Sequence, residues 1–405
     1  TGSERKMKKG LRAAFAGLLC AIVLCGCASA PHDDDPAERG DWMPYDSYSL
    51  ETWLRPVWHT REMYNETVLF VGEEDEAPLL YRPSEIRSVR SYGLNVEYTE
   101  GKDYILTEEG KIRRLRGSAI PYFETDEYYR KEPDSVPVAV FGKYAAGFQE
   151  NRYIKYGEKD TFTSRQIAVT YAHDCVWEGS IPEDKSDRAG KFLKKLEGEK
   201  AAKIVFYGDS ITAGCNASGT EYGGNTLPYT PSYAQMVASS LEDKYAAKIE
   251  CVNTSLGGAN TEWGLENVEK NVISHAPDLV VIAFGMNDAD LTVAKYKRMI
   301  SEMIDKIHAA DPDCAVVAVA TSVPNNETEW FHGNQKEYVA GLKALEREEK
   351  YDFVAVADMT AMHLDLLKAK RFRDMTGNNV NHPNDFLARV YAQVVLQTVA
   401  GHNYI

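Results

Sequence analysis

A serine follows a short apolar run within residues 203–214, where Lys-Ile-Val-Phe-Tyr leads into Gly208, Asp209 and Ser210. Apolar residues of this kind before a turn predict a buried parallel strand with Ser210 at its carboxyl end. Ligands of open α/β sheets bind at that edge. The serine hydroxyl is therefore a candidate nucleophile, although a single Gly-x-Ser is also common where a serine caps a helix.

Three further polar blocks follow in order, and each comes after a strand-like run or before a helix-like one. They are Asn-Thr-Ser-Leu-Gly-Gly at 253–258, Gly-Met-Asn-Asp at 285–288 and His-Pro-Asn at 382–384. We expect all of them to meet at one edge of the sheet. With the serine they offer the groups that cleavage of an acyl ester requires: a nucleophile, a base, and N–H donors for the oxyanion.

These four blocks resemble those of the SGNH (GDSL-type) hydrolase superfamily, and the resemblance extends from about residue 203 to the C-terminus. It implies that Ser210 is the nucleophile and His382 the base. It also implies an oxyanion hole made by the backbone N–H groups of Ser210 and Gly258 and the side-chain amide of Asn287. Gly258 suits this role because a residue without a side chain lets the backbone approach the substrate closely. The neighbouring Asp209 and Asp288 are expected to brace these turns rather than to react.

One position departs from the family pattern. The family usually has an aspartate three residues before the histidine, whereas this chain has Asn379 there. An amide oxygen can accept the Nδ1–H of His382, but it carries no charge to stabilise the imidazolium. Three arrangements are open: Asn379 turned oxygen-first, a backbone carbonyl, or another carboxylate such as Asp374 or Asp385. We favour a Ser-His site in which Asn379 is a neutral partner of the histidine.

The pattern of apolar residues predicts two architectures. From 203 to 405, five strand-like runs alternate with helix-like runs, which predicts a three-layer, flavodoxin-like parallel sheet. Before it, residues 42–180 contain short alternating runs typical of an all-β sandwich or jelly-roll-like domain. These runs include a hairpin over 94–106, a Glu-Gly turn into 111–115, and strands at 136–141 and 166–171; residues 181–202 predict a connecting helix. The layout is similar to that of carbohydrate esterase family two.

The N-terminal residues predict export. A basic stretch beginning at Met7 precedes an apolar run over 13–24 that is too short to favour a membrane-spanning helix. The run ends in Leu-Cys-Gly-Cys, which resembles a bacterial lipobox. Residues 1–27 are therefore interpreted as a lipoprotein signal peptide with lipidation at Cys27, and the polar residues 28–41 as a flexible tether. We expect a bacterial lipoprotein anchored at the cell envelope, either periplasmic or on the cell surface.

The composition limits the classes of molecule that the protein is expected to bind. The 405 residues carry a net charge of −15, and removal of residues 1–27, with five basic residues and one acidic, would make it −19. Such a charge argues against nucleic acid and anionic lipid headgroups as partners and favours a neutral substrate. No Cys/His spacing suggests zinc, and we expect no metal and no cofactor. An exported protein could form a disulfide, for example between Cys175 and Cys215, but the spacing does not fix a pairing.

Two segments at the sheet edge where we expect the active site indicate the class of substrate. Residues 215–231 and 323–334 mix polar and aromatic side chains, which suit a sugar better than a long acyl chain. The sequence therefore favours a serine esterase that removes short acyl groups, acetyl above all, from a small carbohydrate or a polysaccharide. The alternatives are a lysophospholipase or thioesterase acting on lipid acyl groups, and a non-catalytic glycan-binding lipoprotein.

Overall fold

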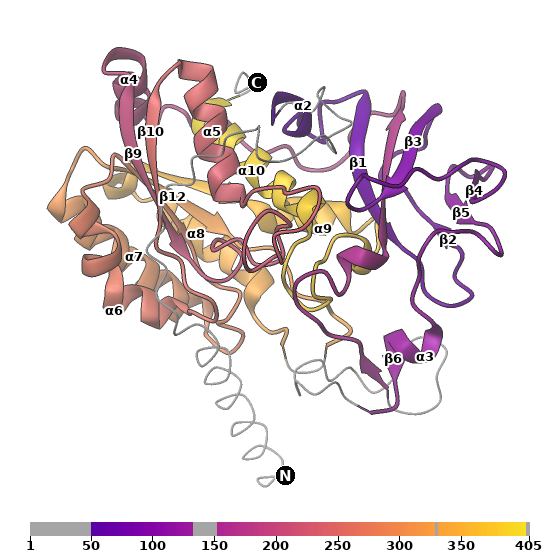
Figure 1. Ribbon diagram of the computed structural model, residues 1–405. Helices are drawn as coiled ribbons and strands as arrows, with labels where there is room; N and C mark the ends of the chain where they lie inside the picture. Colours follow the sequence, from indigo (N-terminus) through magenta and orange to yellow (C-terminus); the bar gives the residue numbers. More distant parts are fainter. Residues whose placement is uncertain (1–49, 133–151, 329–330, 402–405) are drawn as a thin grey trace, which may run out of the picture.

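The computed structural model describes residues 50–132, 152–328 and 331–401 of the chain. Two regions make up these residues (Figure 1). An α/β domain with a single parallel sheet lies on the left of the view, and a smaller region of antiparallel strands, β1 to β5, lies on the right. This is the predicted order of architectures, an antiparallel β region followed by a parallel α/β domain.

The α/β domain is built on a five-stranded parallel sheet with the order β10-β9-β11-β12-β13. Its strands are β9 (Ala201–Gly208), β10 (Lys248–Asn253), β11 (Leu279–Ala283), β12 (Ala315–Ala320) and β13 (Val354–Asp358). This is the flavodoxin-like order, in which the first strand lies between the second and third. The three interior strands are buried along nearly their whole length, as expected for a sheet covered on both faces. The predicted fold of this half is confirmed.

Helices cover both faces of the sheet, and alternate residues of each strand point to opposite faces. On β9, Ile204 and Phe206 pack into one core, and Val205 and Tyr207 pack into the other. The first core is closed by α4 (Gly190–Gly198), α5 (Tyr233–Tyr245), α9 (Met359–Leu366) and α10 (Asp385–Ala400). The second is closed by α6 (Thr261–Asn271), α7 (Val293–Ala310) and α8 (Tyr338–Glu346). Helix α4 lies within the predicted connector, whose boundaries stay a prediction.

The N-terminal region forms small antiparallel sheets. The first sheet has the order β1-β8-β3, with β1 (Glu62–Leu69), β8 (Gln166–Ala172) and β3 (Glu85–Ser91). The second has the order β2-β5-β4, with β2 (Glu76–Ala77), β5 (Ile112–Arg114) and β4 (Tyr104–Leu106). The third pairs β6 (Tyr129–Arg130) with β7 (Tyr153–Ile154). Two short helices, α2 (Leu50–Trp53) and α3 (Thr125–Tyr128), accompany them. The predicted hairpin over 94–106 is wrong: residues 92–94 form a turn, and Leu94 has a left-handed backbone (φ +63°) that interrupts an extended strand.

The antiparallel region is bonded directly to the segment that carries the His-Pro-Asn block. The Asp374 carboxylate accepts the backbone N–H of Leu69 at 2.8 Å, and the Thr67 hydroxyl donates to the Asp374 carbonyl at 2.6 Å. From β8, the Gln166 amide donates to the carbonyls of Arg373 and Thr376. A fully buried ion pair between Lys370 and Glu66 joins the same two regions. Residues 370–384 are thus held against the β region by hydrogen bonds and a buried ion pair.

Several expectations concern residues outside those described. The signal peptide, Cys27, the tether and the strand at 136–141 all lie in undescribed segments. In the part of the chain that is described, no helix has the length and apolar character needed to cross a membrane. Cys175 and Cys215 are both free thiols, so the structure does not contain the disulfide considered above.

Candidate active site

Ser210 lies at the carboxyl end of the central strand β9, where the chain passes very close to β11. A Cβ atom on Gly208 would lie 2.5 Å from the carbonyl oxygen of Ala283, so only glycine fits there. The next residue, Asp209, accepts the backbone N–H of Ile211 at 3.0 Å and so fixes the turn around the serine. Burial raises the pKa of Asp209 to about 7. Asp209 therefore braces the turn, as expected from the sequence.

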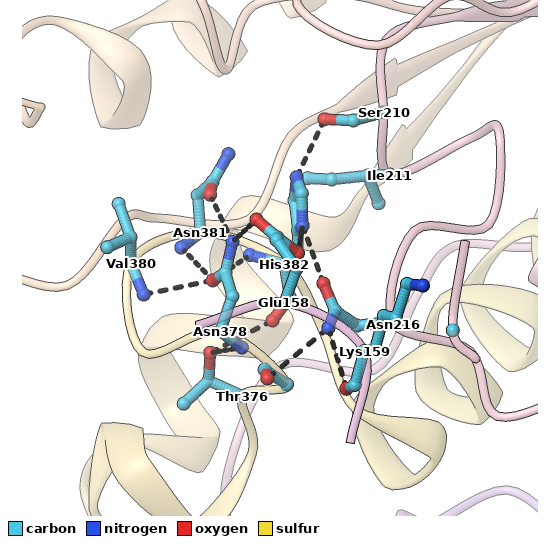
Figure 2. Close-up of polar contacts among 12 residues, drawn as sticks. Glu158, Lys159, Ser210, Ile211, Asn216, Thr376, Asn378, Val380, Asn381 and His382 are labelled. Carbon is cyan, nitrogen blue, oxygen red and sulfur yellow. Dashed lines mark hydrogen bonds and ion pairs between the residues drawn. The ribbon is translucent and has the colours of Figure 1, made fainter. Parts of the chain in front are cut away.

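The structure brings Ser210 and His382 together. The imidazole Nε2 lies 2.9 Å from the serine Oγ, although 172 residues separate the two positions (Figure 2). Both side chains are nearly enclosed, with 3% of Ser210 and 5% of His382 exposed. This is the distance expected between a nucleophile and the base that takes its proton.

The opposite ring nitrogen of His382 faces the side chain of Asn216. Asn216 Oδ1 lies 2.7 Å from His382 Nδ1. The Asn216 Nδ2 group donates to the carbonyls of Lys159 and Gly377, at 3.1 and 3.3 Å, which fixes the amide with its oxygen toward the ring. An amide oxygen only accepts, so the ring must carry its proton on Nδ1. The Nε2 lone pair is then free to accept the serine proton, which is the tautomer that a general base needs.

A carboxylate from the N-terminal region also reaches His382. Glu158, between β7 and the 3-10 turn Thr163–Arg165, has its Oε2 at 3.1 Å from His382 Nδ1. Its Oε1 accepts from the hydroxyl of Tyr156 and from the Nδ2 of Asn378, the latter at 3.1 Å. Burial alone would raise the pKa of Glu158, but the His382 ring, Tyr156 and Asn378 outweigh it and hold the pKa at about 2. Glu158 is therefore ionised at any ordinary pH.

The segment before His382 is wound around two of its own side chains. The Asn378 Oδ1 accepts the backbone N–H groups of Val380, Asn381 and His382, each at 3.0 Å. The Thr376 hydroxyl accepts the N–H of Asn379 at 2.9 Å and donates to the His382 carbonyl at 3.0 Å. Polar side chains thus replace a regular element here, and they set the position of the imidazole (Figure 2).

The structure does not bring Asn379 to His382, so this part of the sequence interpretation requires correction. Asn379 has a left-handed backbone (φ +68°), and its side chain turns toward the N-terminal region. There its Oδ1 accepts from the hydroxyl of Tyr128 at 3.0 Å, and its Nδ2 donates to the carbonyl of Lys155 at 3.0 Å. Asn379 therefore anchors the histidine segment instead of orienting the ring.

The two aspartates considered as substitutes are engaged elsewhere. Asp374 is paired with Arg371 and holds β1, as described above. Asp385, at the start of α10, accepts the backbone N–H and the hydroxyl of Ser218, at 2.8 and 2.6 Å. It thereby fixes the 215–231 segment that follows the nucleophile. The carboxylate at the histidine is Glu158, which the sequence interpretation missed.

The two other oxyanion candidates lie in turns that are bonded to the nucleophile strand and to each other. The N–H of Leu256 donates to the Gly208 carbonyl at 3.1 Å, which holds the turn containing Gly258 (φ +75°) beside β9. Asn287 donates through Nδ2 to the carbonyl of Ala259 at 2.8 Å, so its block is bonded to the turn of Gly258. The second hydrogen of the same amide is available for an oxyanion. Their role in an oxyanion hole stays a prediction.

The remaining predicted features of the site are placed as follows. In the segment 215–231, Tyr222 is 39% exposed and faces solvent. In the segment 323–334, Trp330 lies outside the described residues, and Phe331 packs partly against the larger core. Among residues 50–132, 152–328 and 331–401, no three His, Cys, Asp or Glu side chains form a group that could hold a metal ion.

Glu158 and Asn216 carry no sequence signal that could have assigned them. Glu158 is 224 positions from His382 and lies in a region with a different architecture. Asn216 lies six residues after the nucleophile, in a segment that contains other polar residues. Only the fold brings them together. The one available hint was negative: without an aspartate at position 379, a carboxylate partner of the histidine would have to come from elsewhere in the chain.

Comparison with known proteins shows that the α/β half is similar to a known family. Residues 206–389 match the sequence model of the GDSL-like Lipase/Acylhydrolase family. An uncharacterised protein of Mycoplasma pneumoniae is 24% identical over 273 residues, which cover 63% of this chain and 28% of that protein's length.

Solved structures are similar over about half of the chain. A two-domain esterase active on acetylated mannans, crystallised with mannopentaose, is 20% identical, with a TM-score of 0.42 and coverage of 54% of each chain. An acetylxylan esterase from Geobacillus stearothermophilus is also 20% identical, with a TM-score of 0.41, and the match covers 50% of this chain and 96% of that one. An α/β hydrolase from the metagenome of Lake Arreo, Spain, is 16% identical, with a TM-score of 0.41 and coverage of 50% and 96%.

Proposed function

We propose that this protein, whose residues 206–389 match the GDSL-like Lipase/Acylhydrolase family, is a serine esterase that removes short acyl groups, acetyl above all, from carbohydrate. The observation that carries the proposal is the 2.9 Å contact between Ser210 Oγ and His382 Nε2. Asn216 supports it, because its fixed amide oxygen selects the tautomer in which Nε2 can accept a proton.

The proposed reaction has two halves. In the first, Ser210 Oγ attacks the ester carbonyl carbon while its proton passes to His382 Nε2. The oxyanion is held by the N–H groups of Ser210 and Gly258 and the amide of Asn287. His382 then returns the proton to the departing sugar oxygen as the carbon–oxygen bond breaks, which leaves an acyl-serine. In the second half, His382 takes a proton from water, whose oxygen attacks the acyl carbon. His382 then returns that proton to Ser210 Oγ as the bond between the acyl carbon and Oγ breaks, which releases the carboxylic acid and free Ser210.

Two observations support a short acyl group and a polar leaving group. Only 3% of the Ser210 side chain is exposed, so the reacting carbon must enter a confined space. The adjoining segment 215–231 is held by polar contacts to Asp385 and presents the exposed Tyr222, an aromatic ring of the type on which sugars stack. An acetyl ester on a neutral carbohydrate fits these two features. A neutral substrate also agrees with the net charge of −15 on the protein.

A chain-length series of nitrophenyl esters tests the reaction class. We expect the wild type to hydrolyse the acetate fastest and Ser210→Ala to be inactive at every chain length. Activity that rises from acetate to octanoate would favour lipid acyl groups instead. Failure of a fluorophosphonate probe to label Ser210, together with no hydrolysis, would favour a glycan-binding protein without catalysis. Acetate release from acetylated mannan and xylan then identifies the natural polymer class.

The cellular location is a separate proposal. The Leu-Cys-Gly-Cys sequence at 24–27 supports lipid attachment at Cys27 and anchorage at the cell envelope. Metabolic labelling with a radioactive fatty acid tests it. We expect label in the wild type and none in Cys27→Ala, with the variant released from the membrane fraction. Equal labelling of both proteins would contradict the proposal.

A further inference from the structure

We propose that Glu158, which lies outside the family-matched segment, is the positioning carboxylate of His382 and completes a Ser-His-Glu arrangement across the two regions of the chain. This inference rests on the proposed esterase function, since it assigns a role in the same site. Its evidence is the contact of Glu158 Oε2 with His382 Nδ1 at 3.1 Å, beside the contact of Asn216 Oδ1 with the same nitrogen at 2.7 Å.

The two acceptors have different chemistry, which suggests a division of roles. One Nδ1–H faces both oxygens, and the shorter contact is to the neutral amide of Asn216. The amide is sufficient to fix the tautomer, but it has no charge. During proton transfer the ring becomes a cation, and the Glu158 carboxylate in contact with Nδ1 offers it a negative charge. Asn216 therefore selects the ring's proton position, and Glu158 stabilises the imidazolium.

Glu158 is built into the site and is not a passing surface ion pair. Its second oxygen is held by Tyr156 and Asn378, and the same Asn378 binds the backbone N–H of His382. The carboxylate and the histidine are therefore positioned by a shared residue. Burial raises the pKa values of Tyr156 and Cys215, the titratable groups beside Glu158, so both stay neutral when an esterase is assayed. Within the described residues, the Asp209 carboxyl, next to Ser210 in sequence, also interacts electrostatically with His382.

The position of Glu158 also accounts for the missing family aspartate. In the family pattern the acid precedes the histidine by three residues, and here that position holds Asn379, which bonds Tyr128 and Lys155. Glu158 lies three residues after Lys155 in sequence. The segment 153–158 thus provides both the anchor for Asn379 and the charge that Asn379 cannot supply. The β region is, on this view, part of the catalytic site and not a separate module.

The test compares two glutamates of the same region. Glu158→Gln keeps the size of the side chain and removes its charge. Glu127→Gln is the matched control: Glu127 has 34% side-chain exposure against 36% for Glu158, and it pairs with Lys155 and Arg165 instead of with the histidine. For each protein we would measure kcat and KM with nitrophenyl acetate across pH, together with the unfolding midpoint.

We expect Glu158→Gln to lower kcat by about 10- to 100-fold with little change in KM, the size typical of a lost hydrogen bond to a charged group. The acid limb of its pH profile should move to lower pH, because the protonated ring loses its neighbouring negative charge. Glu158→Asp should recover part of kcat and of the profile. A double variant that also carries Asn216→Ala should fall by about 10⁴-fold, since no acceptor then fixes the tautomer.

Two results would overturn the inference: a Glu158→Gln variant that matches Glu127→Gln in kcat and pH profile, or one whose loss of activity parallels a loss of folded protein with the profile unmoved. Failure of the esterase proposal looks different. In that case the wild type itself would neither hydrolyse the ester nor react with a fluorophosphonate at Ser210.

Discussion

The two side chains proposed to react are held in different ways. Ser210 is positioned by its own neighbourhood in the α/β domain: the buried strand β9, the glycine before the turn and the Asp209 carboxylate. His382 is positioned partly from outside that domain, in addition to its contacts with Asn216 and Asn378. Its ring contacts Glu158, and its segment is bonded to Thr67, Tyr128 and Lys155 of the β region.

This difference means that, on the proposed function, the family-matched segment lacks one residue of the candidate site, Glu158. The nucleophile turn is encoded locally and follows the fold of the parallel sheet. The histidine segment is irregular. Its own Asn378 and Thr376 side chains shape it, whereas the anchors of Asn379 and the charged partner of the ring come from residues that precede the sheet in sequence. Changes on the serine side should therefore leave the joining of the two regions intact, whereas changes on the histidine side should couple chemistry to that joining.

The largest effect is expected from removing either reacting group. Ser210→Ala and His382→Ala should each lower kcat/KM for nitrophenyl acetate by at least about 10⁴-fold, because the nucleophile and its base act as one unit. Ser274→Ala, on an exposed serine whose hydroxyl donates to the Lys270 carbonyl, is the control and should keep full activity. A His382→Ala variant with activity close to wild type would contradict the pairing of the two side chains.

The next effect concerns the serine side alone. Asn287→Ala should lower kcat by about 10²- to 10³-fold through the loss of one oxyanion donor, with KM and the unfolding midpoint little changed. Asn267→Ala removes a similar amide that also donates to a backbone carbonyl, that of Trp263 on α6. Steady-state kinetics of the two variants distinguish an oxyanion donor from an amide that only holds the backbone. Equal and small losses in both would show that Asn287 only braces its turn.

Much of the serine side could be predicted from the sequence, because its signals are local. The apolar runs fixed the strands, and Ser210, Gly258 and Asn287 follow strands at their carboxyl ends. His382 was found through its motif. Its partners could not be found, because Glu158 and Asn216 are brought to the ring by contacts between distant segments. The prediction that Asn379 is the partner of His382 was wrong for a physical reason: the left-handed backbone at Asn379 turns its side chain away from the imidazole ring.

A smaller effect on activity is expected at Asn379, where the change should act on stability. Asn379→Ala removes buried hydrogen bonds to Tyr128 and Lys155 and places alanine at a left-handed backbone. The free energy of unfolding should fall by about 2 kcal/mol, while kcat/KM stays within about tenfold of wild type. Urea denaturation and kinetics measure both. A loss of activity as large as that of His382→Ala would return Asn379 to the catalytic role.

The smallest effect is a change in how stability depends on pH, and it belongs to the serine side. Burial raises the pKa of Asp209 from 3.8 to about 7, so between these values the folded state keeps a proton that the unfolded chain has released. The contribution of Asp209 to stability is therefore fully present below about pH 4 and is lost as the pH rises through about 7. Asp209→Asn should flatten this part of the curve, measured by urea unfolding from pH 4.5 to 8. An unchanged slope would contradict the raised pKa.

The measurement that tests the account most directly is the magnetic resonance signal of the His382 Nδ1 proton in protein labelled with ¹⁵N-histidine. We expect a low-field proton on Nδ1 that is absent in His382→Ala, moves upfield in Glu158→Gln and stays in place in Glu127→Gln. Such a pattern would show that a carboxylate from the β region holds the base of the α/β domain. A signal identical in the wild type and in Glu158→Gln would contradict that claim.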